Sequence, residues 1–247
     1  MIPAIASLGI FTLITLFYII IKYFIVDRSY PKSQFGMALT LFYFVTNIAV
    51  QTFINMSNAK SLCNGAANNI PAIIHTIVPN VLLMGPIVAL LNFFPSWLNP
   101  FSNTLGYAVV KIFTNLSFLE KFPTQRADKV LIQKDKSLFL NEFTPSNYAT
   151  LINKFSSSNP PLINGGNLKN PTPAMKELWS TINIKSNIAL FVWLVLTGSL
   201  VISYSYNSVL NIVCRSTTEE KEKAAKDFDK EQAENQRNKP VEGKFTI

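Results

Sequence analysis

Long apolar runs along the chain predict helices that cross a lipid bilayer. A helix needs about 20 mostly apolar residues to span a hydrocarbon core of about 30 Å. Four runs meet this requirement, at residues 2–21, 35–54, 71–94 and 188–213. A fifth apolar run, 101–118, is interrupted by Lys111 and suits a short span, a re-entrant piece or an interfacial helix. The pattern predicts an all-α, multi-span transmembrane helical protein, with four spans favoured over five.

Polar segments divide the chain around these spans. Residues 1–118 form a predicted membrane domain with three spans and a break marked by Pro and Trp, and 188–213 form the final transmembrane helix. The extramembrane segment 119–187 contains many chain breakers. It therefore holds at best a marginal core of its own and is expected to fold against the membrane domain or a partner. Residues 214–247 are predicted to be a charged helical tail.

The end of this tail has the pattern of a docking peptide. Val241, Phe245 and Ile247 alternate with polar residues over the last seven positions. Such a short alternating segment suits addition as a strand to the exposed sheet edge of a partner. The rival docking site is the apolar surface offered by 138–140 and 148–155 in the middle segment.

The charge distribution sharpens this topology. Only 15% of the residues are charged, against about 25% in soluble proteins, which excludes a single soluble domain. Residues 111–185 hold ten basic and five acidic side chains, and four spans place them on the same side as the basic turn 22–32. A basic excess on one side fits the positive-inside rule. It also indicates contact with lipid headgroups rather than nucleic acid, and Lys22 is expected to snorkel to the membrane edge.

The same topology places the N-terminus and both cysteines, Cys63 and Cys214, on the opposite side. Two free thiols are the favoured expectation there. A disulfide between them and palmitoylation of Cys214 are the alternatives.

Candidate chemistry inside the membrane is limited to a few polar residues, namely Asn47, Gln51, His75 and Asn80. Asn47 and Gln51 lie four residues apart on one helix face, which favours a buried amide pair over a transport pathway. His75 is the only histidine, and the sequence offers no carboxylate near it to orient it for catalysis. We therefore expect no enzyme activity, no metal, no cofactor and no small-molecule substrate.

The segment FPSWLNPFSNTLGY, residues 94–107, breaks the apolar pattern. Its prolines, tryptophan and small polar side chains predict either a stiff corner at the membrane surface that docks a partner or a plain break between helices. The corner residues are Pro95, Trp97, Pro100, Ser102, Asn103 and Thr104.

This segment resembles an FPGW…PFSNTFGY signature of membrane proteins of nucleocytoplasmic large DNA viruses, especially algal and giant icosahedral viruses. The chain departs from it at Ser96 and Leu105, and the likeness covers roughly residues 63–111. The resemblance implies a minor capsid protein in the internal virion membrane, derived from the host, with the bilayer and other capsid proteins as partners. A small channel or transporter, and an assembly scaffold absent from the finished particle, are the alternatives.

Overall fold

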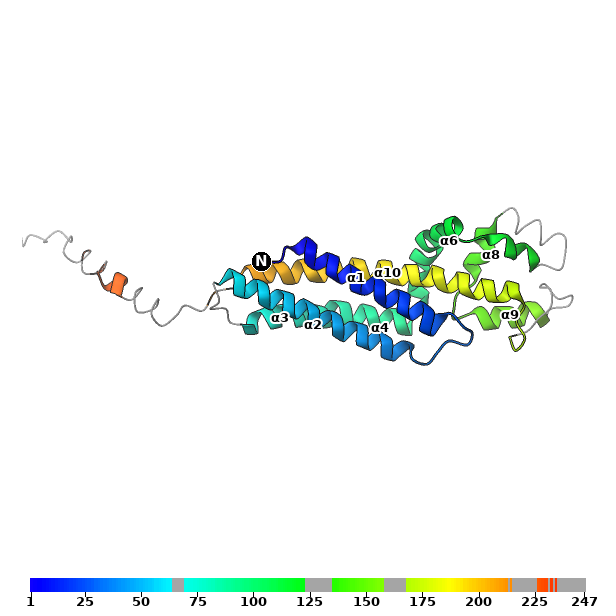
Figure 1. The fold of residues 1–247 in the computed structure, drawn as a ribbon, viewed down its shortest axis with the longest axis horizontal. Helices are drawn as coiled ribbons and strands as arrows, with labels where there is room; N and C mark the ends of the chain where they lie inside the picture. The colour runs from blue at the N-terminus through cyan, green and yellow to red at the C-terminus, as the bar shows by residue number, and fades with distance from the viewer. Residues whose placement is uncertain are drawn as a thin grey trace, which may run out of the picture.

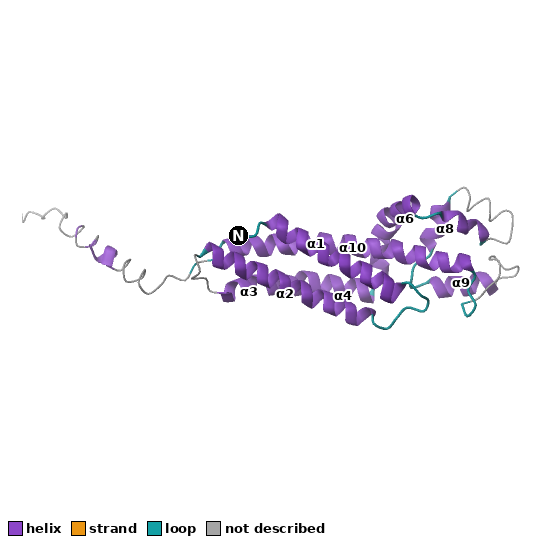
Figure 2. Cartoon of the chain, in the orientation of Figure 1, coloured by secondary structure: helices purple, strands orange, loops and turns teal. Residues whose placement is uncertain are grey.

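The computed structural model describes residues 1–63, 69–122, 135–157, 168–212, 214, 226–230, 232 and 234. These residues form helices and no strand. Long helices run side by side along an elongated bundle, and several short helices gather at one end (Figures 1 and 2). The N-terminus lies at the other end of the bundle.

Four helical rods make up the bundle, and each is long and apolar enough to cross a membrane: Ala4–Asp27, Gly36–Leu62, Asn69–Phe93 and Pro173–Leu210. The first comprises α1 (Ala4–Lys22) and the π-helical turn η1 (Tyr23–Asp27), and the second is α2 (Gly36–Leu62). The third comprises α3 (Asn69–Pro79), the π-helical turn η2 (Asn80–Met84) and α4 (Gly85–Phe93), and the fourth is α10 (Pro173–Leu210). The prediction of an all-α protein with four spans is confirmed.

The bundle is apolar outside and places polar groups inside. Phe17 and Phe53 are 63% and 74% exposed on its surface. In the interior, the Ser7 hydroxyl donates a hydrogen bond to Oε1 of Gln51 at 2.8 Å. In lipid, hydrogen bonds and close packing between helices hold spans together, whereas outward apolar side chains are fully solvated by lipid tails. The polarity of the bundle is therefore that of a membrane protein.

Close packing of α1 on α10 depends on Gly198. A Cβ atom added there would lie 2.1 Å from Cζ of Phe11, whose ring is 2% exposed. The ring belongs to a bundle core that also contains Tyr18, Tyr43, Met84 and Leu194. Because Gly198 has no side chain, the ring of Phe11 lies directly on the α10 backbone.

The last span begins much earlier than the sequence pattern predicted. The expected start was residue 188, but α10 begins at Pro173, after Thr172, whose hydroxyl accepts a hydrogen bond from the Met175 amide. Its 38 residues at about 1.5 Å each give roughly 57 Å, nearly twice the thickness of a bilayer core. The N-terminal part of α10 therefore extends out of the membrane layer.

Around this extension the short helices build what we call the head. It comprises α6 (Tyr107–Phe113), the 3₁₀ helix η5 (Leu116–Lys121), α8 (Lys136–Glu142), α9 (Tyr148–Ser157) and the start of α10. Its core includes Val110, Phe118, Leu140, Ile152, Leu178 and Ile182. The described part of residues 119–187 packs on the membrane domain, because its core forms around the extension of a span.

The interrupted apolar run 101–118 does not form a span. It folds into a continuous helical stretch, 99–113, that comprises α5 (Asn99–Phe101), the π-helical turn η4 (Ser102–Gly106) and α6, and η5 follows it. This stretch is shorter than the roughly 20 residues that a span needs. At Gly106 this segment packs on α10 so closely that an added Cβ would lie 2.5 Å from the Lys185 carbonyl oxygen. The structure therefore supports four spans over five.

A disulfide closes the end of the bundle opposite the head. Cys63 and Cys214 are joined with a Cα–Cα distance of 5.4 Å. Close to them in the sequence, Asn58 accepts a hydrogen bond from the Ile2 amide at 2.6 Å, which ties the N-terminus to the end of α2. The expectation of two free thiols is wrong, because the end of α2 and the end of α10 lie together. The predicted docking residues Val241, Phe245 and Ile247 fall outside the described residues.

Candidate functional site

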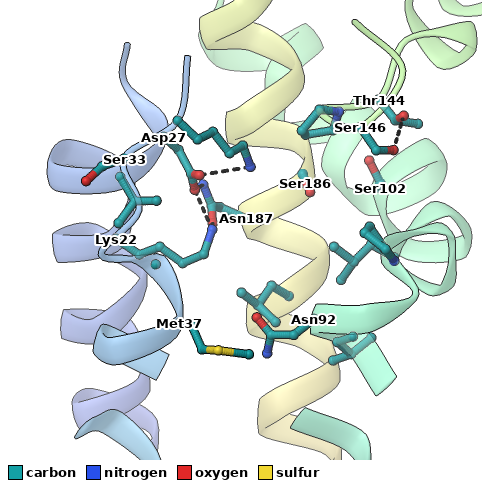
Figure 3. A pocket seen from close by; sticks show the side chains of 18 of the residues that line it. Lys22, Asp27, Ser33, Met37, Asn92, Ser102, Thr144, Ser146, Ser186 and Asn187 are labelled. Carbon is teal, nitrogen blue, oxygen red and sulfur yellow. Dashed lines mark hydrogen bonds and ion pairs between the residues drawn. The ribbon is translucent and has the colours of Figure 1, made fainter. Parts of the chain in front are cut away.

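A pocket of about 340 Å³ lies where the bundle meets the head, and we call it the junction pocket. Its walls come from the end of α1 with η1, the start of α2, the end of α4, the segment 95–102, the loop between α8 and α9, and α10. Figure 3 shows its polar side chains. Lys22, Asp27, Asn187, Ser102, Thr144 and Ser146 are among those that line it.

One buried carboxylate organises the charged side of this pocket. Asp27 is 1% exposed and forms ion pairs with Lys22 and with Lys32, the latter at 2.9 Å. The side-chain amide of Asn187 donates to the same carboxylate at 2.8 Å, and Nζ of Lys22 donates to Oδ1 of Asn187 at 3.0 Å. Two ammonium groups thus share one carboxylate, and the cluster carries a net charge of +1.

The local backbone explains how Lys22 reaches Asp27. The two residues are five apart, and the turn between them, η1, is π-helical. A π-helical turn brings residues i and i+5 into register, whereas an α-helix aligns i and i+4. Lys22 is therefore only 15% exposed and points into the pocket. The expectation that it snorkels outward is wrong, because the π-helical turn directs its ammonium group to Asp27.

The predicted corner residues divide between the pocket and its surroundings. Pro95 and Ser102 line the junction pocket, and Ser102 is 5% exposed. The side chain of Trp97 is 52% exposed, and its carbonyl oxygen accepts a hydrogen bond from the Trp193 indole at 2.9 Å. The Thr104 hydroxyl bonds back to the Pro100 carbonyl at 2.6 Å.

Asn103, the remaining corner residue, connects the corner to the head through a buried lysine. Lys185 is 1% exposed, and its ammonium group donates to Oδ1 of Asn103 at 2.9 Å. It also donates to the Leu140 carbonyl at 3.1 Å and to Oδ1 of Asn141 at 2.8 Å, both in α8. The three donors of the ammonium group therefore join α10, the corner and the head at one point.

Aromatic rings connect the turn after α1 to the head. Tyr30 packs against Tyr148 and Trp179, with ring centroids 5.4 and 5.1 Å apart. Burial, with a smaller contribution from Tyr30, raises the pKa of Tyr148 to about 12. Its hydroxyl therefore stays protonated at neutral pH and donates to the Met175 carbonyl at 3.0 Å. These contacts fix the basic turn to the head.

The predicted intramembrane polar residues do not meet at one site. Asn47 donates to the Tyr43 carbonyl at 3.1 Å, and Asn80 to the Thr76 carbonyl at 2.9 Å, each within its own rod. Gln51 instead bonds to Ser7 across α1 and α2. His75 is half-buried on α3. None of these four residues lines the junction pocket.

A metal centre has no support in the part of the chain that the structure describes, where no three His, Cys, Asp or Glu side chains are grouped to hold an ion.

Sequence reasoning missed the contributions of Asp27, Lys32 and Asn187 to the junction pocket. In the sequence, Asp27 and Lys32 are ordinary charged residues of a short turn, and Asn187 is the last residue of the predicted extramembrane segment.

The fold and the pocket define a four-span α-helical membrane protein with a folded extramembrane head. No family model, curated protein or solved structure matches the chain. The likeness of residues 94–107 to a viral signature therefore stays a prediction.

Proposed function

We propose that this protein is a structural membrane anchor, a minor capsid component that attaches the capsid shell of a large icosahedral DNA virus to its internal membrane. The observation that carries the proposal is the head, which is fixed to the bundle through the unbroken helix α10. A folded module held rigidly beside the bilayer is what an anchor needs to present to a shell. The resemblance of residues 94–107 supports the viral assignment.

Orientation favours the head as the part that contacts the shell. The described head and the basic turn carry lysines at one end of the bundle, and basic loops face the cytoplasm. The Cys63–Cys214 disulfide lies at the other end, and structural disulfides persist in oxidising compartments. Both criteria support a cytoplasmic position of the head at a host membrane. Shell proteins that assemble without crossing that membrane would meet the head first.

Several apolar residues of the head are buried and therefore unavailable for docking a partner. Leu140, Tyr148 and Ile152, which the sequence offered as apolar docking residues, are at most 2% exposed and belong to the core of the head. Leu138 is 70% exposed on α8. The head therefore offers Leu138 and its surroundings, and the tail peptide 241–247 remains the competing hypothesis.

The experiment compares two variants in purified particles. Leu138→Glu places a charge on the exposed face of α8, and deletion of 241–247 removes the tail peptide. We expect Leu138→Glu to lower the amount of protein per particle several-fold, whereas the deletion leaves it unchanged. Lys154→Glu, a charge change elsewhere on the head surface, serves as the control. Membrane insertion is checked for every variant by extraction with carbonate.

Two outcomes separate the alternatives. If only the deletion reduces incorporation, the tail is the docking element and the head is not. If the wild-type protein is absent from purified particles, the anchor is wrong and an assembly scaffold replaces it. A channel is the weaker alternative because Asn47, Gln51 and Asn80 form hydrogen bonds within or between neighbouring helices.

A further inference from the structure

The junction pocket holds more positive charge than its own residues neutralise. An ammonium group has three donors. Lys22 directs two of them at Asp27 and Asn187, and Lys32 forms an ion pair with the other carboxylate oxygen of Asp27 at 2.9 Å. Removing a charge from water is costly unless an opposite charge compensates it. The side chains of Lys22 and Lys32 are 15% and 37% exposed, so the excess unit of positive charge borders the pocket where an anionic ligand can reach it and compensate it.

Small polar groups face this charge across the pocket. The hydroxyl-bearing residues Ser33, Ser102, Thr144 and Ser146 line it, together with the amide-bearing residues Asn92 and Asn99. Hydroxyl and amide groups can donate hydrogen bonds to several oxygens of one anion. A phosphate group, with its several acceptor oxygens, matches a wall of this kind better than a single carboxylate does.

An apolar groove continues from the pocket into the membrane layer. A second cavity of about 230 Å³ lies between α2 and α4, and Met37 and Asn92 line both cavities. Figure 3 shows these two side chains together at the edge of the pocket, away from Thr144 and Ser146. The groove reaches Phe44 on α2 and Gly85 on α4. Seven residues of helix from Met37 to Phe44 correspond to about 10 Å.

The groove opens on the outer surface of two spanning helices. Met37 is 55% exposed, and Ala89, on the α4 side, is also exposed. Except for Thr40 and Asn92, the residues that line the groove are apolar or glycine. In a bilayer, the molecules that reach such a surface are lipids, so an acyl chain is the fitting occupant.

We propose that the junction pocket and this groove together bind one anionic phospholipid. The phosphate lies against Lys22 and Lys32, and one acyl chain lies in the groove between α2 and α4. This inference goes beyond the proposed anchoring function and does not depend on it, because it concerns which lipid surrounds the bundle and not what the head contacts.

Binding is measured on the full-length protein in detergent by native mass spectrometry. The probes are phosphatidylglycerol, phosphatidylcholine and inorganic phosphate. Lys32→Gln removes the excess charge and leaves the pair between Lys22 and Asp27 in place. Lys136→Gln, a lysine of the head that pairs with Glu120 at 2.9 Å, is the matched control. Thermal unfolding of each variant verifies that it folds.

A second pair of variants tests the groove. Ala89→Trp fills the groove from an exposed position, and Ala49→Trp makes the same change at an exposed position of α2 outside it. We expect the wild-type protein to bind phosphatidylglycerol at least tenfold more tightly than phosphatidylcholine. Lys32→Gln and Ala89→Trp should each weaken binding of phosphatidylglycerol at least fivefold, and neither control should change it.

Three results would overturn the proposal. Equal binding of the two lipids, or equal effects of Lys32→Gln and Lys136→Gln, would show that the pocket does not select an anion. If inorganic phosphate binds the pocket in a Lys32-dependent manner and Ala89→Trp has no effect on phosphatidylglycerol, the ligand is a free anion and not a lipid.

Discussion

Replacement of Lys185 by methionine should loosen the head. Methionine has a similar length and no donors, so the change removes the hydrogen bonds to Asn103, Leu140 and Asn141 while it keeps most of the packing. Each buried acceptor left without a donor costs about 1 kcal/mol or more. The Leu140 carbonyl is buried and the two amide oxygens are part-buried. About 3 kcal/mol is therefore the upper end of the expected loss, before any gain from no longer burying an ammonium group.

Hydrogen exchange of the α8 amides is the suitable measurement. These amides lie in the part of the head that Lys185 holds to α10, and local opening governs their exchange. A loss of about 3 kcal/mol should accelerate their exchange by roughly 100-fold, because about 1.4 kcal/mol corresponds to a factor of ten. Amides in the middle of α2 should be unaffected.

The control is Lys176→Met, the same chemical change at an exposed position of α10. If the α8 amides exchange at the same rate in the Lys185→Met and Lys176→Met variants, the three hydrogen bonds contribute no net stability. The reasoning would then be refuted, since the energy returned by not burying an ammonium group would equal the energy lost at the acceptors.

Three further predictions follow from the packing, the disulfide and the topology. Gly198→Ala should destabilise the bundle by about 1–3 kcal/mol, because the added methyl group requires an aromatic ring on α1 to move; an unchanged thermal midpoint in detergent would contradict this. Joint replacement of Cys63 and Cys214 by Ala should lower the free energy of unfolding by about 2–5 kcal/mol, and a reducing agent should lower the wild-type midpoint but not that of the variant. Cysteines introduced singly at positions 157 and 216, in a background lacking Cys63 and Cys214, should react with an impermeant maleimide from opposite sides of sealed vesicles. Labelling of both from one side would contradict a single membrane crossing by α10 between them.

The spans were predictable because lipid imposes a simple requirement on them. A run of about 20 apolar residues is needed whatever its neighbours are, so residues 2–21 and 35–54 could be assigned one at a time. The start of α10 at Pro173 could not be predicted in this way. Met175, Leu178 and Trp179 lie among polar residues, and their burial depends on the head, which is formed by segments far away in the sequence.

The junction pocket was less accessible to sequence reasoning. Lys22, Asp27 and Asn187 are unremarkable as single residues, and only a π-helical turn and the meeting of α1 with α10 bring them together. Such contacts between distant segments leave no local periodicity. The corner 94–107 was recognised from its prolines and tryptophan. The position of Pro95 and Ser102 in a wall of the pocket depends on the same long-range packing.

The length of the unbroken helix α10 determines how far the head lies from the bilayer. α10 is one helix of about 57 Å, and a bilayer core takes up about 30 Å of it. About 27 Å of the helix is therefore left to extend beyond the core. The head is built around that projection, so its height above the bilayer is set by the number of residues between Pro173 and the membrane. Insertion or removal of one helical turn there would change the gap between the lipid and anything attached to the head by about 5.4 Å. The distance between the bilayer and any partner bound to the head would therefore follow from the length of α10.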